Sequence, residues 1–519
     1  MNSVPSRMLL RGGSVYSPES PSATAMLTVD GTVAWVGDDD TAATYVDTAD
    51  ILVDLQGRLL TPGFVDAHAH LGQTGFTLQS VNLSRTVSKA EALAELESLA
   101  GQHQGSVLYA QGWDETRWPE AHAITRSELD RAVGGKVAYV ARVDCHSAVV
   151  SSALVARQPG ITALDGWRDD GLVERDAHHA AREVTQDLWT ANDRAEALLT
   201  SLRHAARQGI TCLHDLSAPQ LAPFEDFAIV RRLRKEHRLP AVVPYWGELM
   251  AEGVDPSKVA GLAGDLCADG AIGSRTACMH EPYADDATTG HLYIDSTQVR
   301  DHVVFCTERG LQAGFHVIGD RAMREVIAGF RQAADKLGTD VIVAARHRLE
   351  HVEMPDPESI QTMAALGLVA SVQPAFDAAW GGIGGMYELR LGAARARPMN
   401  PLGSMQRAGV VLALGSDSPV TPLDPWAGVR AAANHHNTDE RLTIRTAFHA
   451  HTSGGHRACR KDSGGVLRPG ADASYAVWDV HSPPADAPWL PDLHPDAELP
   501  TCVRTVVSGQ TIFNAEDDQ

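Results

Sequence analysis

Short apolar runs alternate with amphipathic stretches through the middle of the chain. The stretches 91–100, 195–207 and 321–337 have apolar positions at helical spacing, whereas the other runs have the length of strands. We expect eight strands, one that ends at His70 and seven later ones, at 209–215, 241–246, 265–269, 312–316, 347–351, 368–373 and 410–417. Strands that alternate with helices in this way predict an α/β fold, a (β/α)8 barrel of the TIM type.

Both ends of the chain have a different pattern, with short strands and turn residues. The runs 25–29 and 32–37 flank Asp30-Gly31, which is a strong signal for a β-hairpin, and the C-terminal end has similar strand-like runs. We therefore expect residues 1–60 and 465–519 to form one small β-sandwich domain.

The barrel is expected to occupy residues 61–464. The gap between its first two strands is too long for a single βα loop, and it has its own apolar run at 137–143 and its own helical patterns. We interpret residues 75–200 as an inserted α/β subdomain that covers the mouth of the barrel.

Composition and charge narrow the class of protein. The 519 residues include 44 basic and 66 acidic ones, and the net charge of −22 argues against nucleic acid or an anionic membrane as a partner. No apolar run suits a signal peptide or a membrane span, and the seven cysteines have no CxxC spacing. We expect a soluble cytoplasmic protein without structural disulfides that acts on a small molecule, and a homodimer is compatible with this picture.

The strand that ends at His70 carries the first chemical signal. His68 and His70 are two residues apart, so both imidazoles lie on the same face of a strand. A lone His-x-His pair also occurs on surface strands. Here Phe64 and Val65 indicate a buried strand, and buried imidazoles need partners such as a divalent metal ion.

Three further residues of ligand type end apolar strands, namely His316, His351 and Asp417. Each has an ordinary explanation by itself, since Asp417, for example, is also a candidate helix N-cap before Ser418. Together with His68 and His70 they predict a metal site at the active-site face of the barrel. Four imidazoles and one carboxylate suit Zn²⁺ best, with Fe²⁺ or Mn²⁺ as alternatives.

Five motifs extend the pattern over nearly the whole chain, at 61–70, 269–277, 316–322, 350–351 with 373–374, and 415–419. In this order they resemble the metal-dependent amidohydrolase superfamily, specifically the amidohydrolase-3 group of YtcJ-like proteins and N-substituted formamide deformylases. The resemblance implies a distorted TIM barrel with a small β-sandwich. It also implies that the metal ligands are His68, His70, His316, His351 and Asp417.

The chain departs from this family at one position. Such proteins usually carry a lysine four residues before the Asp-Gly of the second motif, and this lysine bridges two metals after carboxylation. Here that position is Asp265, whose side chain is several ångströms shorter. Asp265 either bridges from a closer strand, leaves one metal bound or lies away from the ions. Cys267 is a further candidate ligand, although a buried structural cysteine is the simpler interpretation.

A catalytic scheme follows from these residues. Asp417 is the expected general base and then acid, and His146 or Arg275 is the expected donor to a carbonyl oxygen. His146 has an equally weighted structural interpretation, as a histidine bonded to Asp144. His214 is a weaker candidate, and Trp113 and Trp118 suit either a pocket wall or core packing.

The resulting prediction is a metal-dependent hydrolase that cleaves amide-type C–N bonds, other than peptide bonds, in a small N-formyl or N-acyl amine. A deaminase and a lactone or ester hydrolase are alternatives, because the same activated water attacks any of these electrophiles. A non-catalytic metal-binding or scaffold protein is the alternative from another class. The absent lysine favours it, whereas the proton-accepting Asp417 argues against it.

Overall fold

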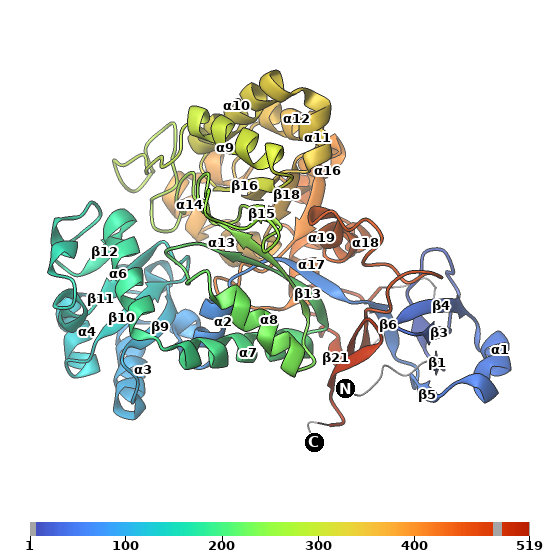
Figure 1. The fold of residues 1–519 in the computed structure, drawn as a ribbon. Coiled ribbons are helices and arrows are strands. Elements are labelled where there is room, and N and C mark those ends of the chain that lie inside the picture. Colours follow the sequence, from blue (N-terminus) through green and yellow to red (C-terminus); the bar gives the residue numbers. More distant parts are fainter. Residues whose placement is uncertain (1–6, 481–489, 518–519) are drawn as a thin grey trace.

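The computed structural model describes residues 7–480 and 490–517. Residues 1–6, where no signal peptide is expected, lie outside the described ranges, as do 481–489 and 518–519. An eight-stranded parallel sheet with helices around it occupies the centre of the molecule, which confirms the predicted fold class (Figure 1). In spatial order its strands are β19 (Val411–Leu414), β18 (Val369–Val372), β17 (Arg348–His351), β16 (Gln312–Val317), β15 (Gly261–Leu262), β14 (Ala241–Trp246), β13 (Ile210–Ser217) and β7 (Phe64–Ala69).

One predicted strand is displaced. Residues 265–269 are not a strand, and the fourth barrel strand is the two-residue β15, which ends before Gly264 with its φ of +90°. Asp269 instead accepts hydrogen bonds from the backbone N–H groups of Ile318 and Gly319, at 3.0 and 2.7 Å. The segment is therefore a loop anchored to β16, and its pairing with that strand is limited to one isolated parallel bridge between Cys267 and His316, in which the Ala268 N–H donates to the His316 carbonyl at 2.9 Å.

The two edge strands of the sheet, β7 and β19, meet at their C-terminal ends. The backbone N–H of Asp417 donates to the carbonyl of His68 at 2.8 Å, and the N–H of His70 donates to the carbonyl of Ser418 at 2.9 Å. The Asp66 carboxylate also accepts from the N–H groups of His68 and Ser416. These contacts close the barrel at the end where the candidate ligands lie.

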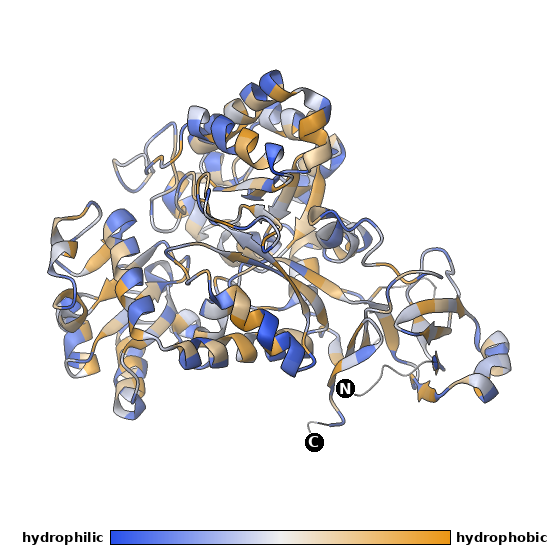
Figure 2. Cartoon of the chain, in the orientation of Figure 1, coloured by the Kyte–Doolittle hydropathy of each residue, from blue (hydrophilic) through white to orange (hydrophobic). Residues whose placement is uncertain are grey.

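Amphipathic helices surround the barrel and turn their apolar faces toward it (Figure 2). Phe64 of β7 is fully buried, and its ring lies 5.0 to 5.6 Å from the rings of Trp426, Phe448 and Trp478. The main helices of this layer are α7 (Ala191–Arg207), α8 (Asp226–Glu236), α9 (Ser296–Glu308), α10 (Asp320–Leu337), α12 (Pro357–Ala365), α16 (Leu402–Ala408), α17 (Pro425–Ala433), α18 (Ile444–Ala450) and α19 (Ser453–Ala458).

A second α/β layer lies between β7 and β13 in the sequence and at one side of the barrel (Figure 1). Its five-stranded sheet has the order β12-β11-β10-β9-β8 and its own apolar core. The strands are β8 (Val81–Asn82), β9 (Leu108–Trp113), β10 (Ala138–Arg142), β11 (Ser147–Val150) and β12 (Leu172–Glu174), and the helices include α3 (Lys89–Gln102), α4 (Arg126–Val133) and α6 (Arg175–Leu188).

Two small sheets combine the ends of the chain on the other side. One has the order β4-β3-β1-β5, with β1 (Arg7–Arg11), β3 (Ala25–Val29), β4 (Thr32–Gly37) and β5 (Ile51–Asp54). The other has the order β2-β6-β20-β21-β22, with β2 (Ser14–Val15), β6 (Leu59–Pro62), β20 (Tyr475–Asp479), β21 (Thr501–Val507) and β22 (Gln510–Asn514). They share one apolar core, and the domain limits at 60/61 and 464/465 stay a prediction.

The predicted hairpin at the N-terminal end is confirmed. β3 and β4 pair antiparallel, and Asp30 and Gly31 between them have φ values of 50° and 77°. Positive φ at both turn positions matches the right-handed twist of the strands, and glycine adopts it without steric cost.

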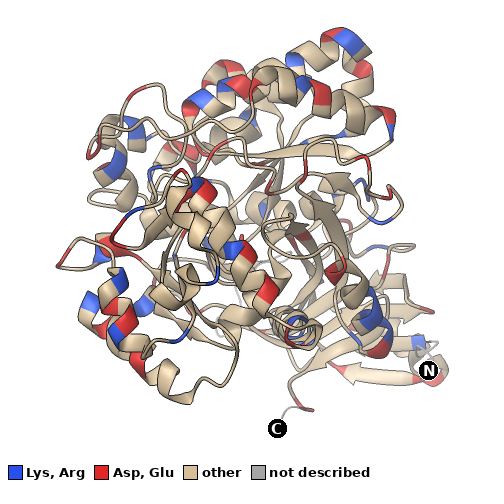
Figure 3. Ribbon diagram, turned by 60° about the vertical axis from the view of Figure 1, so that its left-hand side comes forward, with Lys and Arg blue, Asp and Glu red and all other residues tan. Residues whose placement is uncertain are grey.

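Charged residues are found mainly in helices and loops (Figure 3). Within the described ranges, no helix combines the length and the apolar character that crossing a bilayer requires.

Replacing Phe64 tests the packing of β7 against its aromatic neighbours. Phe64→Ala is expected to cost about 3–5 kcal/mol of unfolding free energy, because the ring leaves a cavity among three other aromatic residues. Urea unfolding of the barrel measures this. Ile383→Ala, at a fully exposed position, is the control and should change stability by less than about 0.5 kcal/mol. Equal stability of the two variants would contradict the packing argument.

Candidate metal centre

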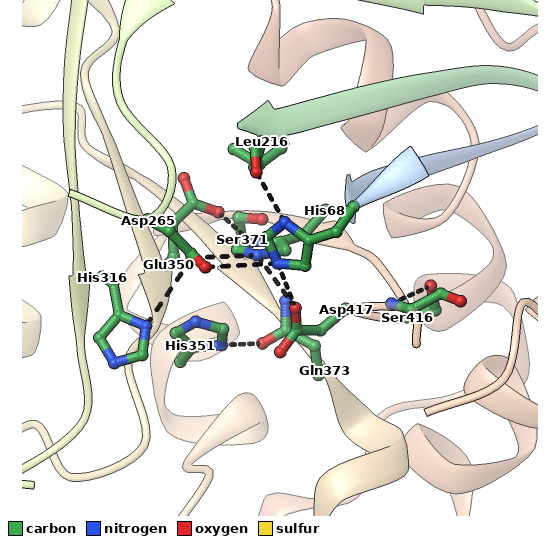
Figure 4. A network of polar contacts seen from close by, with 12 residues as sticks. His68, Leu216, Asp265, His316, Glu350, His351, Ser371, Gln373, Ser416 and Asp417 are labelled. Carbon is green, nitrogen blue, oxygen red and sulfur yellow. Dashed lines mark hydrogen bonds and ion pairs between the residues drawn. The ribbon is translucent and has the colours of Figure 1, made fainter. Parts of the chain in front are cut away.

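The predicted ligands come together at the C-terminal ends of the barrel strands (Figure 4). His68 lies in β7, His70 directly follows this strand, and Asp417 follows β19 beside them. The Asp417 Oδ1 atom lies 3.2 Å from His68 Nε2 and 2.9 Å from His70 Nε2. One carboxylate oxygen therefore faces two imidazoles from the first strand.

Asp265 reaches the same cluster from the loop after β15. Its Oδ1 lies 3.5 Å from His68 Nε2 and 3.9 Å from His316 Nδ1, and its Oδ2 lies 3.4 Å from His70 Nε2. Ligand atoms of His68, Asp265 and His351 also lie within 4.8 Å of one another. All six predicted ligands thus belong to one cluster, although their role as ligands stays a prediction.

The chemistry of the cluster fits a metal ion. Three of its buried atoms, namely His68 Nε2, His316 Nδ1 and Asp265 Oδ1, have no hydrogen bond of normal geometry to any described residue. An unsatisfied buried polar atom is costly, and each of these atoms is a good ligand for a divalent cation. Coordination would satisfy all three at once.

Each imidazole is held by its other ring nitrogen, which donates to an oxygen. This contact fixes the ring orientation and leaves the free nitrogen aimed at the cluster, as in known metal sites. The acceptors are Glu350 Oε2 for His68 Nδ1 at 2.9 Å, the Leu216 carbonyl for His70 Nδ1 at 2.6 Å, Gln373 Oε1 for His351 Nδ1 at 2.8 Å, and the Gly270 carbonyl for His316 Nε2 at 3.2 Å.

Charges in the cluster are strongly coupled. Burial alone would lower the pKa of His68, but Asp417, Asp265 and Glu350 raise it well above its usual value. Burial would likewise raise the pKa of Asp265 and Asp417, but the neighbouring histidines hold both below the usual range. Without an ion, a proton on His68 balances these carboxylates, and a divalent cation would take over that role.

A buried ion pair supports His68 from behind. Arg348 and Glu350 are both fully buried, and Arg348 Nη2 donates to Glu350 Oε2 at 3.0 Å. Although burial would raise the pKa of Glu350, the charge of Arg348 and the bond to His68 lower it to about 2. His214 belongs to this layer, since its Nδ1 lies 3.0 Å from Arg348 Nη1, and so it does not join the metal cluster.

His146 faces the site, whereas Arg275 does not. The His146 ring lies 4.9 Å from that of His316, and it lines cavities together with His316, His351 and Asp417. Burial and the nearby His316 lower the pKa of His146 well below its usual value, so it is a neutral donor. Only its backbone N–H bonds to Asp144.

The expected position of Arg275 beside the ligands is not found. Its guanidinium forms two hydrogen bonds to Asp285, at 3.0 and 2.6 Å, and it lines a separate cavity. The Asp285 carboxylate, ten residues later in the chain, therefore holds the Arg275 side chain away from the ligands.

Three further candidates from the sequence analysis have surroundings that suit a structural role, namely Trp113, Trp118 and Cys267. The Trp113 and Trp118 indoles donate to backbone carbonyls and belong to the apolar core beside β9. Cys267 borders the cluster, and its thiol, whose pKa burial raises well above the usual value, donates to the Asp265 backbone carbonyl at 3.5 Å.

Sequence reasoning missed some residues at the site. Glu353 lines a cavity with His316 and His351, and burial raises its pKa to about 8. Arg182 of α6 borders the cluster from the inserted layer. Glu353 follows a predicted ligand by two positions, which is a usable signal, whereas nothing near Arg182 in the sequence indicated its position.

The family model described as the amidohydrolase family matches residues 52–513 of the chain. The chain belongs to the amidohydrolase family. This membership confirms the resemblance seen in the sequence motifs, and it identifies the protein as a hydrolase rather than a non-catalytic scaffold.

Individual relatives agree with this assignment. The chain is 26% identical to YtcJ of Bacillus subtilis (strain 168), over 98% of this chain and 99% of that one. It is 24% identical to an N-substituted formamide deformylase of Arthrobacter pascens, over 88% and 90% of the two chains. A metal-dependent hydrolase from Pyrococcus horikoshii OT3 shares the fold, with a TM-score of 0.72, 24% identity and coverage of 91% and 97%.

Glu350→Gln tests the support of His68. The amide keeps the shape but loses the charge that Arg348 and His68 share, so metal affinity is expected to fall about 10- to 100-fold. Competition with a chelator of known affinity measures this. Glu440→Gln, at a buried carboxylate that accepts from Ser404, is a matched control and should bind metal normally. Unchanged affinity in Glu350→Gln would contradict the supporting role.

Proposed function

We propose that this protein is a zinc-dependent hydrolase that cleaves the C–N bond of a small N-formyl or N-acyl amine. The observation that carries the proposal is the position of Asp417, which contacts His68 and His70 and also lines the cavities at the cluster. His68, His70, His316, His351, Asp417 and Asp265 would hold the ion. A bound zinc ion would lower the pKa of water toward neutrality and polarise a carbonyl group.

Asp417 is the proton carrier in this proposal. The carboxylate lines the cavities at the cluster, so an Oδ atom is placed to accept a proton from the attacking water. The same carboxylic acid then delivers the proton to the leaving nitrogen, and the C–N bond breaks to give a carboxylic acid and an amine.

His146 is proposed to orient the substrate carbonyl. Its low pKa keeps the ring neutral, and a neutral imidazole donates one N–H without bringing a charge that would compete with the ion. It lines both cavities that reach Asp417, so this donor faces the space that a substrate would enter.

The size of the site favours a small acyl group. The two cavities that reach Asp417 measure only about 20 and 30 Å³. An outer cavity of about 580 Å³ shares Trp380 and Val420 with the inner one and offers a route for the rest of the substrate. The formyl group is the smallest acyl group, and one relative is a formamide deformylase.

Asp417→Asn tests the proton carrier. The amide cannot accept the proton, so kcat for an N-formyl amine is expected to fall about 10²–10⁴-fold while zinc stays bound. Turnover and zinc content are measured on the same preparation. Near-normal turnover would remove Asp417 from the mechanism, whereas lost zinc would assign it to binding alone.

Metal stoichiometry tests the role of Asp265. Because its oxygens lie within 4 Å of His68, His70 and His316, we expect it to help enclose a single tightly held ion. Elemental analysis should give nearer one zinc than two per chain, and Asp265→Asn should weaken retention during dialysis against a chelator. Two tightly held ions per chain would instead favour Asp265 as a bridge.

A further inference from the structure

Two arginines, Arg85 and Arg117, line the outer cavity of about 580 Å³ that adjoins the metal centre. Both are exposed, and they end the 3₁₀ helices η2 (Leu83–Arg85) and η3 (Glu115–Arg117) of the inserted layer. The Nη1 atom of Arg117 donates to the Ser84 carbonyl at 2.7 Å, which joins the two helices. The two guanidinium groups therefore come from neighbouring segments of the same cavity wall.

Neither guanidinium group has a carboxylate partner among the described residues. Arg117 bonds to a backbone carbonyl, and Arg85 forms no hydrogen bond or ion pair within the described ranges. By contrast, the arginines around the neighbouring cavity each pair with a carboxylate, namely Arg142, Arg275 and Arg390. A chain with a net charge of −22 thus leaves two cations without an anionic partner at the outer cavity.

The carboxylate that lines the same cavity is already neutralised. Asp114 is 4% exposed, and its Oδ1 accepts from Arg142 Nη2 at 3.0 Å and from the Thr116 hydroxyl at 2.6 Å. Burial lowers the pKa of His204, which also lines the cavity, so its ring adds a polar group rather than a charge at neutral pH. The described lining therefore presents a positive charge to a ligand.

The outer cavity adjoins the cluster through a shared wall. Its lining includes Ser418, the residue directly after Asp417. Trp380 and Val420 line both this cavity and the inner one that contains Asp417, whereas the two arginines line only the outer cavity. A ligand that reaches from Asp417 to the arginines would therefore pass Trp380 and Val420.

We propose that Arg85 and Arg117 bind a carboxylate at the far end of the amine part of the substrate, separated from the scissile bond by apolar carbons. The proposal rests on the proposed function and names the class of substrate, an ω-(acylamino)carboxylate. Hydrolysis of the formyl compound would release formate and an ω-amino acid.

The chemistry of the outer cavity matches both parts of such a chain. A guanidinium group is planar and offers several N–H donors that suit a carboxylate. Leu78, Val143 and Leu423 of the lining suit the apolar spacer. Small-ligand sites measure about 300–1,000 Å³, and the cavity falls in this range.

Charge selects an anion over a cation at this site. A cationic end would be repelled by both guanidinium groups and would gain little from Asp114, whose charge Arg142 offsets. Because Arg85 and Arg117 are exposed, water and salt screen their attraction. We therefore expect a moderate preference that weakens as the ionic strength rises.

Pairs of substrates with equal size and different charge test this proposal. They are N-formyl ω-amino acids of four, six and eight carbons, each compared with its terminal amide. At the best chain length, kcat/KM is expected to be about 10-fold higher for the acid, and salt at about 0.5 M should reduce this ratio. The gain should be in KM rather than kcat, because the carboxylate lies away from the bond that breaks. N-(6-aminohexyl)formamide should be the poorest six-carbon substrate.

Variants assign the preference to the two arginines. Arg85→Gln and Arg117→Gln should each reduce the ratio of acid to amide, and the double variant should bring it close to one. Arg117→Lys should keep more of the ratio than Arg117→Gln, because it keeps the charge. Arg157→Gln, at an exposed arginine of the inserted layer outside the lining of this cavity, is the matched control and should keep the wild-type ratio.

Binding of the products provides a readout that does not need turnover. Calorimetric titration of the purified protein with 6-aminohexanoate and 6-aminohexanamide should show tighter binding of the carboxylate. The difference should disappear in the double variant and persist in Arg157→Gln.

The two proposals fail in different ways. Equal kcat/KM for acid and amide at every chain length and low ionic strength would overturn the carboxylate site and keep the proposed function. Binding of 6-aminohexanoate that depends on both arginines, without turnover of any formamide, would keep the carboxylate site and overturn the function. A preference for the acid that survives the double variant would overturn the role of Arg85 and Arg117.

Discussion

The hydrogen bonds that close the barrel between β7 and the segment after β19 determine where the candidate ligands lie. His70 and Asp417 are separated by 347 positions in the sequence, yet their side chains are 2.9 Å apart. The backbone bonds from Asp417 to His68 and from His70 to Ser418 hold these two segments in register. A closed barrel leaves no free edge, so the same contacts complete the sheet and assemble half of the cluster.

The buried charges near the contact between β7 and β19 are tolerated because each charged group faces a partner that offsets it. Arg348 neutralises Glu350, Glu350 orients His68, and His68 faces Asp417 and Asp265. A buried ion pair contributes little stability by itself, because desolvation offsets the attraction. Here the pair serves to orient the His68 ring. Glu350 accepts from His68 Nδ1, so His68 Nε2 stays free to face the cluster. A divalent cation that faces the two carboxylates would complete the arrangement.

Local patterns in the sequence predicted part of this structure. The two-residue spacing of His68 and His70 and the apolar strands before His316 and His351 were sufficient to predict the barrel and the cluster. Periodicity failed where tertiary contacts override it. Residues 265–269 have the apolar pattern of a strand but form a loop that keeps only one isolated bridge to β16 and is anchored by Asp269, and Arg275 pairs with Asp285 instead of facing the site. Tyr387 and Glu353 line one cavity, and no sequence spacing links them.

The displaced strand also explains how a short carboxylate takes part in the centre. A lysine in the sheet would reach the ions through a long side chain, as the family resemblance implies for this position. Asp265 is not in the sheet, because β15 ends at Leu262 and Gly264 redirects the backbone. The backbone of the loop supplies the reach that the side chain lacks, and the Asp265 carboxylate comes within 3.5 Å of both His68 and His70. The loop conformation and the short carboxylate therefore act together to bring an oxygen to the cluster.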